Sequence, residues 1–119
     1  MRDRNLYFEY LRSRSIIGLL YRKFWLYPRL CQYLKGKVLD LGCGIGDLLR
    51  FRPNTAGIDI NPVAVEWCKS IKLEVYEMVE DNLPFQDGSF DGVVLDNVLE
   101  HILYPEPLLA EIIRVLKVR

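Results

Sequence analysis

An aspartate and three closely spaced glycines follow an apolar stretch in VLDLGCGIGDLL, residues 38–49. The glycines are Gly42, Gly44 and Gly46. Glycines let a chain turn with positive φ and let a ligand approach the backbone closely. Asp40 precedes the glycines and Asp47 follows them, and two carboxylates at such a turn oppose a pyrophosphate and attract a cation. The pattern therefore predicts a ligand site that favours positive charge.

The glycine spacing separates two classes of ligand. Dinucleotide sites use GxGxxG, where a pyrophosphate lies at a helix amino terminus, whereas this chain has GxGxG. A dinucleotide or nucleotide-sugar oxidoreductase is therefore disfavoured. S-adenosylmethionine carries a sulfonium, an ammonium and a ribose but no phosphate, which suits the turn. Asp59, at the end of the next predicted strand, is placed to accept hydrogen bonds from the ribose hydroxyls.

Strand and helix patterns alternate along the chain. Strands are predicted at residues 37–41, 56–60, 73–78 and 90–95, and helices at residues 47–51, 62–71 and 107–116. Asn61 followed by Pro62 is typical of a helix start. Apolar residues fall at helical spacing from residue 5 to 34, and Pro28 begins a second helix that is predicted to end at Gly36. This order predicts an α/β doubly wound domain with a parallel sheet, whose ligands bind at the carboxyl ends of the strands.

Charge is distributed unevenly, although the formal net charge of the 119 residues is zero. Residues 1–37 contain nine Lys or Arg and two acids, and the remainder contains seven basic and fourteen acidic residues. Either the two parts attract each other or face solvent, or the basic arm meets an anionic substrate or a membrane surface. Zero net charge by itself predicts neither a nucleic-acid nor a membrane partner.

The three cysteines, Cys31, Cys43 and Cys68, show no CxxC spacing. This pattern predicts neither a disulfide framework nor a zinc site, so we expect no metal and buried thiols in a reducing compartment. No apolar run reaches the roughly 20 residues that span a bilayer, and the first fifteen residues lack the apolar centre of a signal peptide. A cytoplasmic location is therefore expected.

Four segments resemble successive motifs of the class I S-adenosylmethionine-dependent methyltransferases, in their small-molecule branch. They are VLDLGCGIGDLL, GIDINPVAVEWCK, LPFQDGSFDGVVLDNVLEHI and LLAEIIRVLK. The resemblance covers residues 36–117 and implies a Rossmann-like, mostly parallel sheet of about four strands in the order 3-2-1-4, flanked by helices. It divides the chain into an amino-terminal helical arm or lid, residues 1–35, and an incomplete cofactor-binding core, residues 36–119.

The resemblance also implies which residues bind the cofactor. They are Asp40, Gly42, Cys43, Gly44, Gly46, Asp59, Ile60, Glu80, Asp81, Asp96 and Asn97. The residues of the glycine turn face the methionine portion, the pair at 59–60 faces the ribose and adenine, and the pair at 96–97 lies nearest the transferable methyl. Glu80 or Asp81 replaces the acid that the family often has where this chain has Val79. Cys43 is expected to be a small loop residue rather than a nucleophile.

No catalytic residue is assigned from the pattern. His101, the only histidine, is a candidate general base, and a histidine at a helix end without a chemical role is the alternative. Methyl transfer depends mainly on placing the nucleophile close to the methyl carbon and in line with it, so a catalytic triad is not required.

Two functions follow as hypotheses. The first is transfer of a methyl group from S-adenosylmethionine to a small acceptor. An anionic acceptor is one form of this hypothesis. The second is a non-catalytic half-domain that binds the cofactor or a partner. The family sheet continues beyond the motif that ends in RVLKVR, so the strand at residues 90–95 is predicted to be an exposed edge. The chain is therefore expected to form a homodimer or to depend on a partner.

Overall fold

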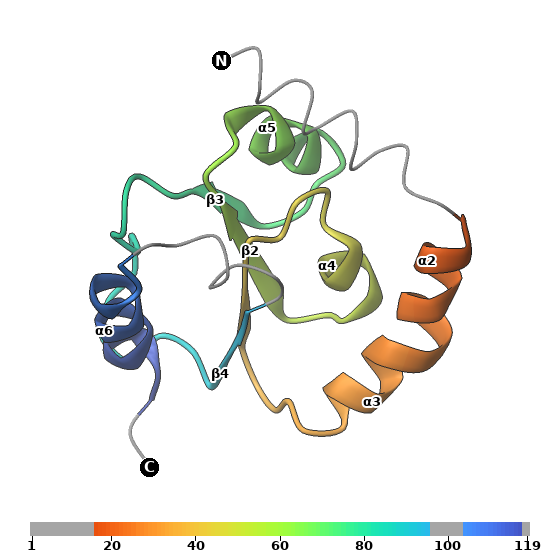
Figure 1. Cartoon of the computed structure of the whole chain (residues 1–119), viewed down its shortest axis with the longest axis horizontal. Helices are drawn as coiled ribbons and strands as arrows, with labels where there is room; N and C mark the ends of the chain where they lie inside the picture. Colours follow the sequence, from red (N-terminus) through yellow and green to blue (C-terminus); the bar gives the residue numbers. More distant parts are fainter. Residues whose placement is uncertain (1–15, 96–103, 118–119) are drawn as a thin grey trace.

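The computed structural model describes residues 16–95 and 104–117 of the chain (Figure 1). Its elements are α2 (Ile16–Tyr21), the π-helical turn η1 (Arg22–Leu26), α3 (Tyr27–Cys31), β1 (Val38–Leu41), α4 (Asp47–Phe51), β2 (Thr55–Asp59), α5 (Pro62–Ser70), β3 (Val75–Glu77), β4 (Gly92–Leu95) and α6 (Glu106–Val115). From β1 to β3, strands alternate with helices as the sequence predicts. None of the described helices is long and apolar enough to cross a membrane.

The four strands form one sheet in the order β3-β2-β1-β4, and every pairing is parallel. The predicted α/β, Rossmann-like fold and its strand order are therefore confirmed. All residues of β1 and β2 are buried, as expected of central parallel strands that are covered on both faces. The residues of β4 are only half-buried, and β4 pairs with β1 alone among the described strands. Within that part of the chain, β4 is an edge of the sheet.

Two apolar clusters cover the two faces of the sheet, because successive side chains of a strand point in opposite directions. Leu39 and Leu41 of β1 pack in one cluster with α6, which lies on one side of the sheet in Figure 1. A second cluster joins α4, α5 and β3 through residues such as Leu49, Val65 and Cys68. Asp40 lies between Leu39 and Leu41 in β1, so it points away from α6 and toward the face that carries α3 and α4.

The helical segment α2–η1–α3 ends earlier than the sequence predicts. Pro28 lies in the first turn of α3, as expected, but the helix stops at Cys31 instead of continuing to Gly36. Gly36 has φ +68°, and a Cβ built there would collide with the carboxylate of Asp91. That carboxylate accepts a hydrogen bond from the Lys37 backbone N–H at 2.8 Å. These contacts from a distant loop hold the residues just before β1 in a conformation that glycine adopts readily.

A helix cap that the sequence predicts is confirmed at α5. The side chain of Asn61 accepts a hydrogen bond from the Val63 N–H at 3.0 Å, and Pro62 occupies the first helical position. Such a cap satisfies one of the free N–H groups at a helix start, and replacing it by alanine typically costs about 1 kcal/mol.

Glu111 and Arg114 of α6 bind the loop between β3 and β4. Glu111 accepts hydrogen bonds from the Leu83 N–H at 2.9 Å and from the Arg114 guanidinium at 2.6 and 3.0 Å. Arg114 also donates to the carbonyl oxygens of Leu83 and Phe85. The hydrogen bonds from Arg114 and Leu83 lower the pKa of Glu111 to about 2. One ion pair therefore attaches a loop to the helix that covers one face of the sheet.

We predict that this ion pair makes stability depend on pH in the acid range. The pKa of Glu111 is about 2 in the folded chain, below its ordinary value of 4.5. Its stabilisation is therefore complete above pH 4.5 and is lost as the pH falls through about 2. Thermal unfolding should show Glu111→Gln less stable than the parent near neutral pH, with the difference disappearing toward pH 2. Glu66→Gln, at an exposed position of α5, is the control. A difference that stays constant with pH would contradict the assignment.

Candidate functional site

The glycine turn joins β1 to α4 at the carboxyl edge of the sheet. Gly42, Gly44 and Gly46 all have positive φ, between 57° and 82°. At Gly46, which caps α4, an added Cβ would lie 2.5 Å from a methyl carbon of Leu73. A side chain at this position would therefore be both strained and crowded. The sequence prediction that these glycines form a tight strand-to-helix turn is confirmed.

Asp59 ends β2 and is hydrogen-bonded to the glycine turn. One carboxylate oxygen accepts from the Gly44 N–H at 2.8 Å, and the other accepts from the Asn61 N–H at 2.9 Å. The side chain is buried, and burial raises the pKa of Asp59, while hydrogen bonds from Asn61, Gly44 and Ile60 oppose the shift. A positively charged ligand beside this carboxylate would stabilise its ionised form. Each oxygen retains acceptor capacity for a ligand hydroxyl.

Two thiols lie behind the glycine turn, on its core side. Cys43 and Cys68 are buried in the cluster that joins α4 and α5, and the Cys68 thiol donates to the Gly44 carbonyl oxygen at 3.3 Å. The hydrogen bond with Cys68 and burial raise the pKa of the Cys43 thiol well above its ordinary value. A protonated, buried thiol is a poor nucleophile, which agrees with the expectation for Cys43. Its side chain packs in the core, so any contact with a ligand would come from its backbone.

The carboxyl ends of β2 and β3 lie side by side. Asp59 pairs with Glu77, and the Asp59 carbonyl accepts from the Met78 N–H at 2.9 Å. Ile60 and Val79 follow these two strand ends and are 55% and 65% exposed, respectively. Their apolar side chains therefore lie exposed at the edge of the sheet where Asp59 ends β2. Val79 is a residue that sequence reasoning passed over because it carries no acid.

The turn after β3 carries the two predicted acids. Val79 forms a bridge with Asn82, which closes the turn around Glu80 and Asp81. Glu80 is exposed and has φ +56°, and Asp81 is half-buried. The structure therefore brings both acids to the same edge of the sheet as Asp59.

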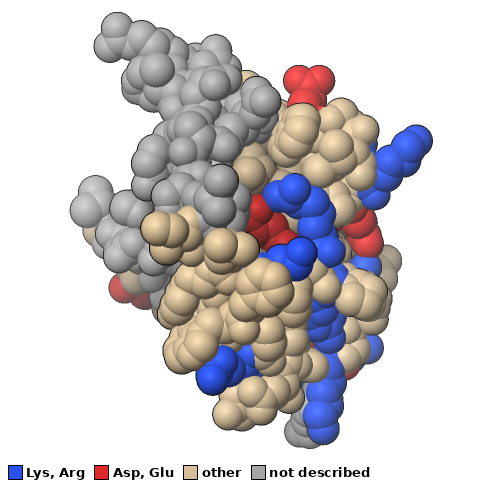
Figure 2. All heavy atoms as spheres, turned by 90° about the vertical axis from the view of Figure 1, so that its right-hand side faces the viewer, with Lys and Arg blue, Asp and Glu red and all other residues tan. Residues whose placement is uncertain are grey.

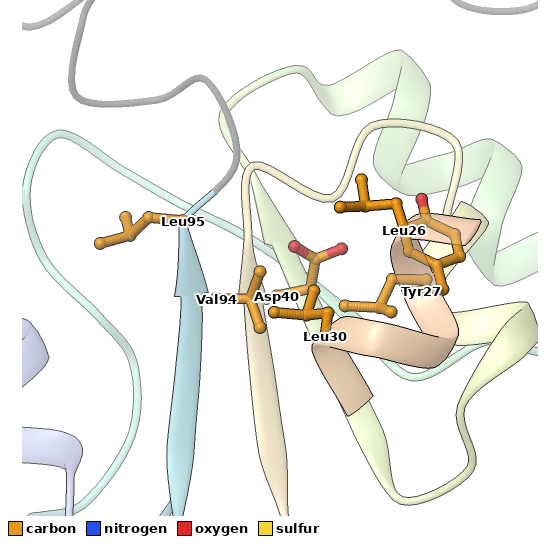
Figure 3. Close-up of a pocket in the computed structure, with 7 residues that line it drawn as sticks. Leu26, Tyr27, Leu30, Asp40, Val94 and Leu95 are labelled. Carbon is orange, nitrogen blue, oxygen red and sulfur yellow. The ribbon is translucent and has the colours of Figure 1, made fainter. Parts of the chain in front are cut away.

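A cavity of about 210 Å³ lies between the helical segment and the ends of β1 and β4. It is lined by Leu26, Tyr27, Leu30, Asp40, Leu48, Val94 and Leu95. Figure 3 shows the Asp40 carboxylate between β4 and the side chains of α3. Sequence reasoning identified Asp40 but not the leucines of the arm. The sequence feature that could have identified them is the helical spacing of residues 26, 27 and 30, which places three apolar side chains on one face of the helix.

Three predicted residues lie outside the described part of the chain. They are Asp96, Asn97 and His101. Asp96 and Asn97 directly follow β4, whose end borders the cavity. Across residues 16–95 and 104–117, no three His, Cys, Asp or Glu side chains are grouped as metal ligands would be.

Known proteins share both the sequence and the fold of this chain. The model of a family described as "Methyltransferase domain" matches residues 39–119. "Probable tRNA methyltransferase 9B" of Mus musculus is 30% identical over 108 residues, which cover 85% of this chain and 24% of the relative. "24-methylenesterol C-methyltransferase 2" of Arabidopsis thaliana is 38% identical over 94 residues, or 68% of this chain and 26% of the relative. The chain thus spans about a quarter of each of these relatives.

A solved structure has the same fold. The SAM-dependent methyltransferase of Thermotoga maritima superposes with a TM-score of 0.74 at 21% identity, over 95% of this chain and 56% of that protein. The resemblance deduced from the glycine turn and the three later motifs is confirmed, because the family model covers β1 through α6. The chain belongs to the S-adenosylmethionine-dependent methyltransferase family.

Proposed function

We propose that the described residues form the cofactor-binding half of a methyltransferase site, with S-adenosylmethionine against the glycine turn. The observation that carries the proposal is the Asp59 carboxylate, held by the Gly44 and Asn61 N–H groups at the side of the turn. Its remaining lone pairs suit the two ribose hydroxyls. The exposed side chains of Ile60 and Val79 suit the faces of an adenine ring, and Glu80 or Asp81 suits its exocyclic amine.

The Asp40 carboxylate suits the positive charges at the other end of the cofactor, because it lines the cavity. Asp47 begins α4 beside Gly46, but its carboxylate already forms an ion pair with the Arg50 guanidinium at 2.7 Å. A sulfonium and an ammonium are both cations, and their attraction to a carboxylate is strong where water is excluded. The bound cofactor supplies a methyl group activated by its sulfonium. The residues of this chain orient that group and exclude water from it.

The cavity next to Asp40 suits a small acceptor with apolar surface. Among the described residues, its lining is leucine, valine and tyrosine apart from the one carboxylate, with no Lys or Arg. Apolar side chains favour burial of an apolar acceptor by roughly 25 cal/mol for each Å² removed from water. The anionic acceptor that the basic arm suggested stays a hypothesis. The names of the relatives, which refer to tRNA and to a sterol, differ too much to choose an acceptor.

The alternative function is a cofactor-binding unit that works with other segments or a partner. The half-buried residues of the β4 edge support it, since an unpaired strand offers N–H and C=O groups to another chain. We propose a two-fold dimer through β4 as the simplest assembly. The division of the chain into an amino-terminal arm, residues 1–35, and a core, residues 36–119, also stays a prediction. The same holds for the cytoplasmic location.

The role of Asp59 predicts a loss of cofactor affinity on substitution. Asp59→Ala should weaken binding of S-adenosylmethionine by about 1–3 kcal/mol, because hydrogen bonds to a charged acceptor are lost. Asp59→Asn should also weaken binding, since its amide keeps one acceptor oxygen but turns an NH₂ donor toward either the Gly44 or the Asn61 N–H. Isothermal titration calorimetry measures both, and Glu106→Ala on α6 is the control. Unchanged affinity in the alanine variant, or tight binding of NADH by the parent chain, would contradict the site.

The apolar cavity predicts a variant that separates binding from transfer. Leu30→Phe fills part of the cavity and should reduce methyl transfer at least about tenfold while calorimetry shows cofactor affinity within twofold of the parent. Radiolabelled methyl transfer to a panel of small phenols, amines and thiols gives the rate. Leu109→Phe, on α6, is the matched control. Equal rates in both variants would show that the acceptor binds elsewhere, and no transfer by the parent to any acceptor would favour the non-catalytic alternative.

The β4 edge predicts a dimer that a strand peptide dissociates. Multi-angle light scattering on a dilution series should show a mass that falls from dimer to monomer as concentration decreases. A synthetic peptide with the sequence of residues 90–96, FDGVVLD, should lower the mass at fixed concentration by pairing with the same edge. A peptide of the same composition in scrambled order is the control. A monomer at every concentration would rule out the dimer.

A further inference from the structure

The helical segment α2–η1–α3 has two apolar faces. One face packs inward, where Tyr27 is 7% exposed and Leu26 and Leu30 line the cavity. The other face is open: Ile17 is 80% exposed and Phe24 is 68% exposed. The exposed apolar side chains of this segment are Ile17, Leu20, Tyr21, Phe24 and Trp25, and we refer to them as the outer face. A helical segment that only covered a core would be polar on its outer side.

Cations lie directly beside the aromatic rings of the outer face. The Arg29 guanidinium lies 4.4 Å from the centre of the Trp25 ring, and the Lys23 ammonium lies 5.7 Å from the centre of the Phe24 ring. Residues 10–39 contain seven Lys or Arg and no Asp or Glu. In Figure 2, which faces this side of the molecule, blue Lys and Arg side chains border a broad uncharged surface. The outer face therefore combines exposed apolar area with positive charge.

We propose that the outer face binds an anionic lipid surface. An amphipathic helix that lies on a membrane has Trp, Phe and Leu on one side with Lys and Arg beside them. Anionic headgroups attract each nearby cation, and the apolar side chains enter the boundary between headgroups and acyl chains. The docking itself does not depend on the proposed methyltransferase function.

Two other occupants fit the outer face less well. Single-stranded nucleic acid needs open aromatic faces for its bases, but the Trp25 ring is already stacked with Tyr21 at 5.2 Å and contacts Arg29. Ile17 and Leu20 are aliphatic and provide no stacking surface. A second copy of the chain would place two groups of cations against each other, which costs energy where solvent is excluded.

The docking has a consequence for the cavity. Because the inner face of the same segment supplies Leu26, Tyr27 and Leu30 to the cavity, docking would place the cavity close to the lipid surface. If the proposed function holds, an acceptor dissolved in the membrane would have a short path to the cofactor. This consequence rests on the proposed function, whereas the binding experiment below does not.

Sedimentation with vesicles tests the proposal in the absence of cofactor and acceptor. The whole chain should pellet with phosphatidylcholine vesicles that contain phosphatidylserine, and less with pure phosphatidylcholine or at high salt. The variant with Phe24→Ser and Trp25→Ser should bind at least about tenfold more weakly. Ile113→Ser, at a 72% exposed position of α6 on the other side of the sheet, should bind like the parent. Since the changed residues are exposed, circular dichroism should show each variant folded.

A second variant tests the charge. Lys23→Glu with Arg29→Glu keeps most of the apolar area and should lose the preference for phosphatidylserine. No sedimentation of the parent with either vesicle would overturn the proposal, as would equal losses in the outer-face and Ile113 variants. Binding of polyuridylate that depends on Phe24 and Trp25, without binding to vesicles, would identify a nucleic-acid surface instead. A dimer that the same two changes dissociate, again without vesicle binding, would identify a contact between copies.

Discussion

The buried carboxylate of Asp59 is the interaction on which the site depends. A charged group in the interior is costly unless hydrogen bonds compensate for the lost water, so both of its oxygens must find donors. They find them in the Gly44 N–H of the glycine turn and the Asn61 N–H at the start of α5. One side chain therefore fixes the end of a central strand, the turn beside it and the helix that follows. Because the strand is buried on both faces, the position of this carboxylate is set by the sheet itself.

The parts of the fold that sequence predicts well are those determined by neighbouring residues. The bounds of α4 follow from the last glycine and from the turn at Pro53 and Asn54, and the start of α5 follows from an asparagine cap and a proline. The ligand class is also predicted by neighbouring residues, because the glycines and carboxylates that set the shape and charge of the turn lie close together in the sequence. The strand order followed from the resemblance to a family with four motifs in sequence. The structure confirms that order.

Features that depend on contacts between distant segments could not be predicted. The conformation of the chain just before β1 depends on Asp91, which accepts a hydrogen bond from the Lys37 N–H across 54 residues of sequence. The binding of the loop by Arg114 involves carbonyl groups about thirty residues away, and backbone carbonyls leave no signal in a sequence. The cavity combines α3, β1, α4 and β4, so no single motif contains it. The sequence showed that residues of the arm were apolar, but it did not show that its described part, α2–η1–α3, has two apolar faces.

The pairing of β4 with β1 costs more chain entropy than the pairing of β2 with β1. It closes a loop about three times as long as the one that joins β1 to β2, and longer loops cost more chain entropy. Since the residues of β4 are also only half-buried, we expect its amides to exchange with solvent more readily than those of the two central strands. Val94 and Leu95 form one wall of the cavity. Transient opening of that wall would let the cavity widen for bulkier molecules, while the glycine turn, anchored through β2, keeps its shape.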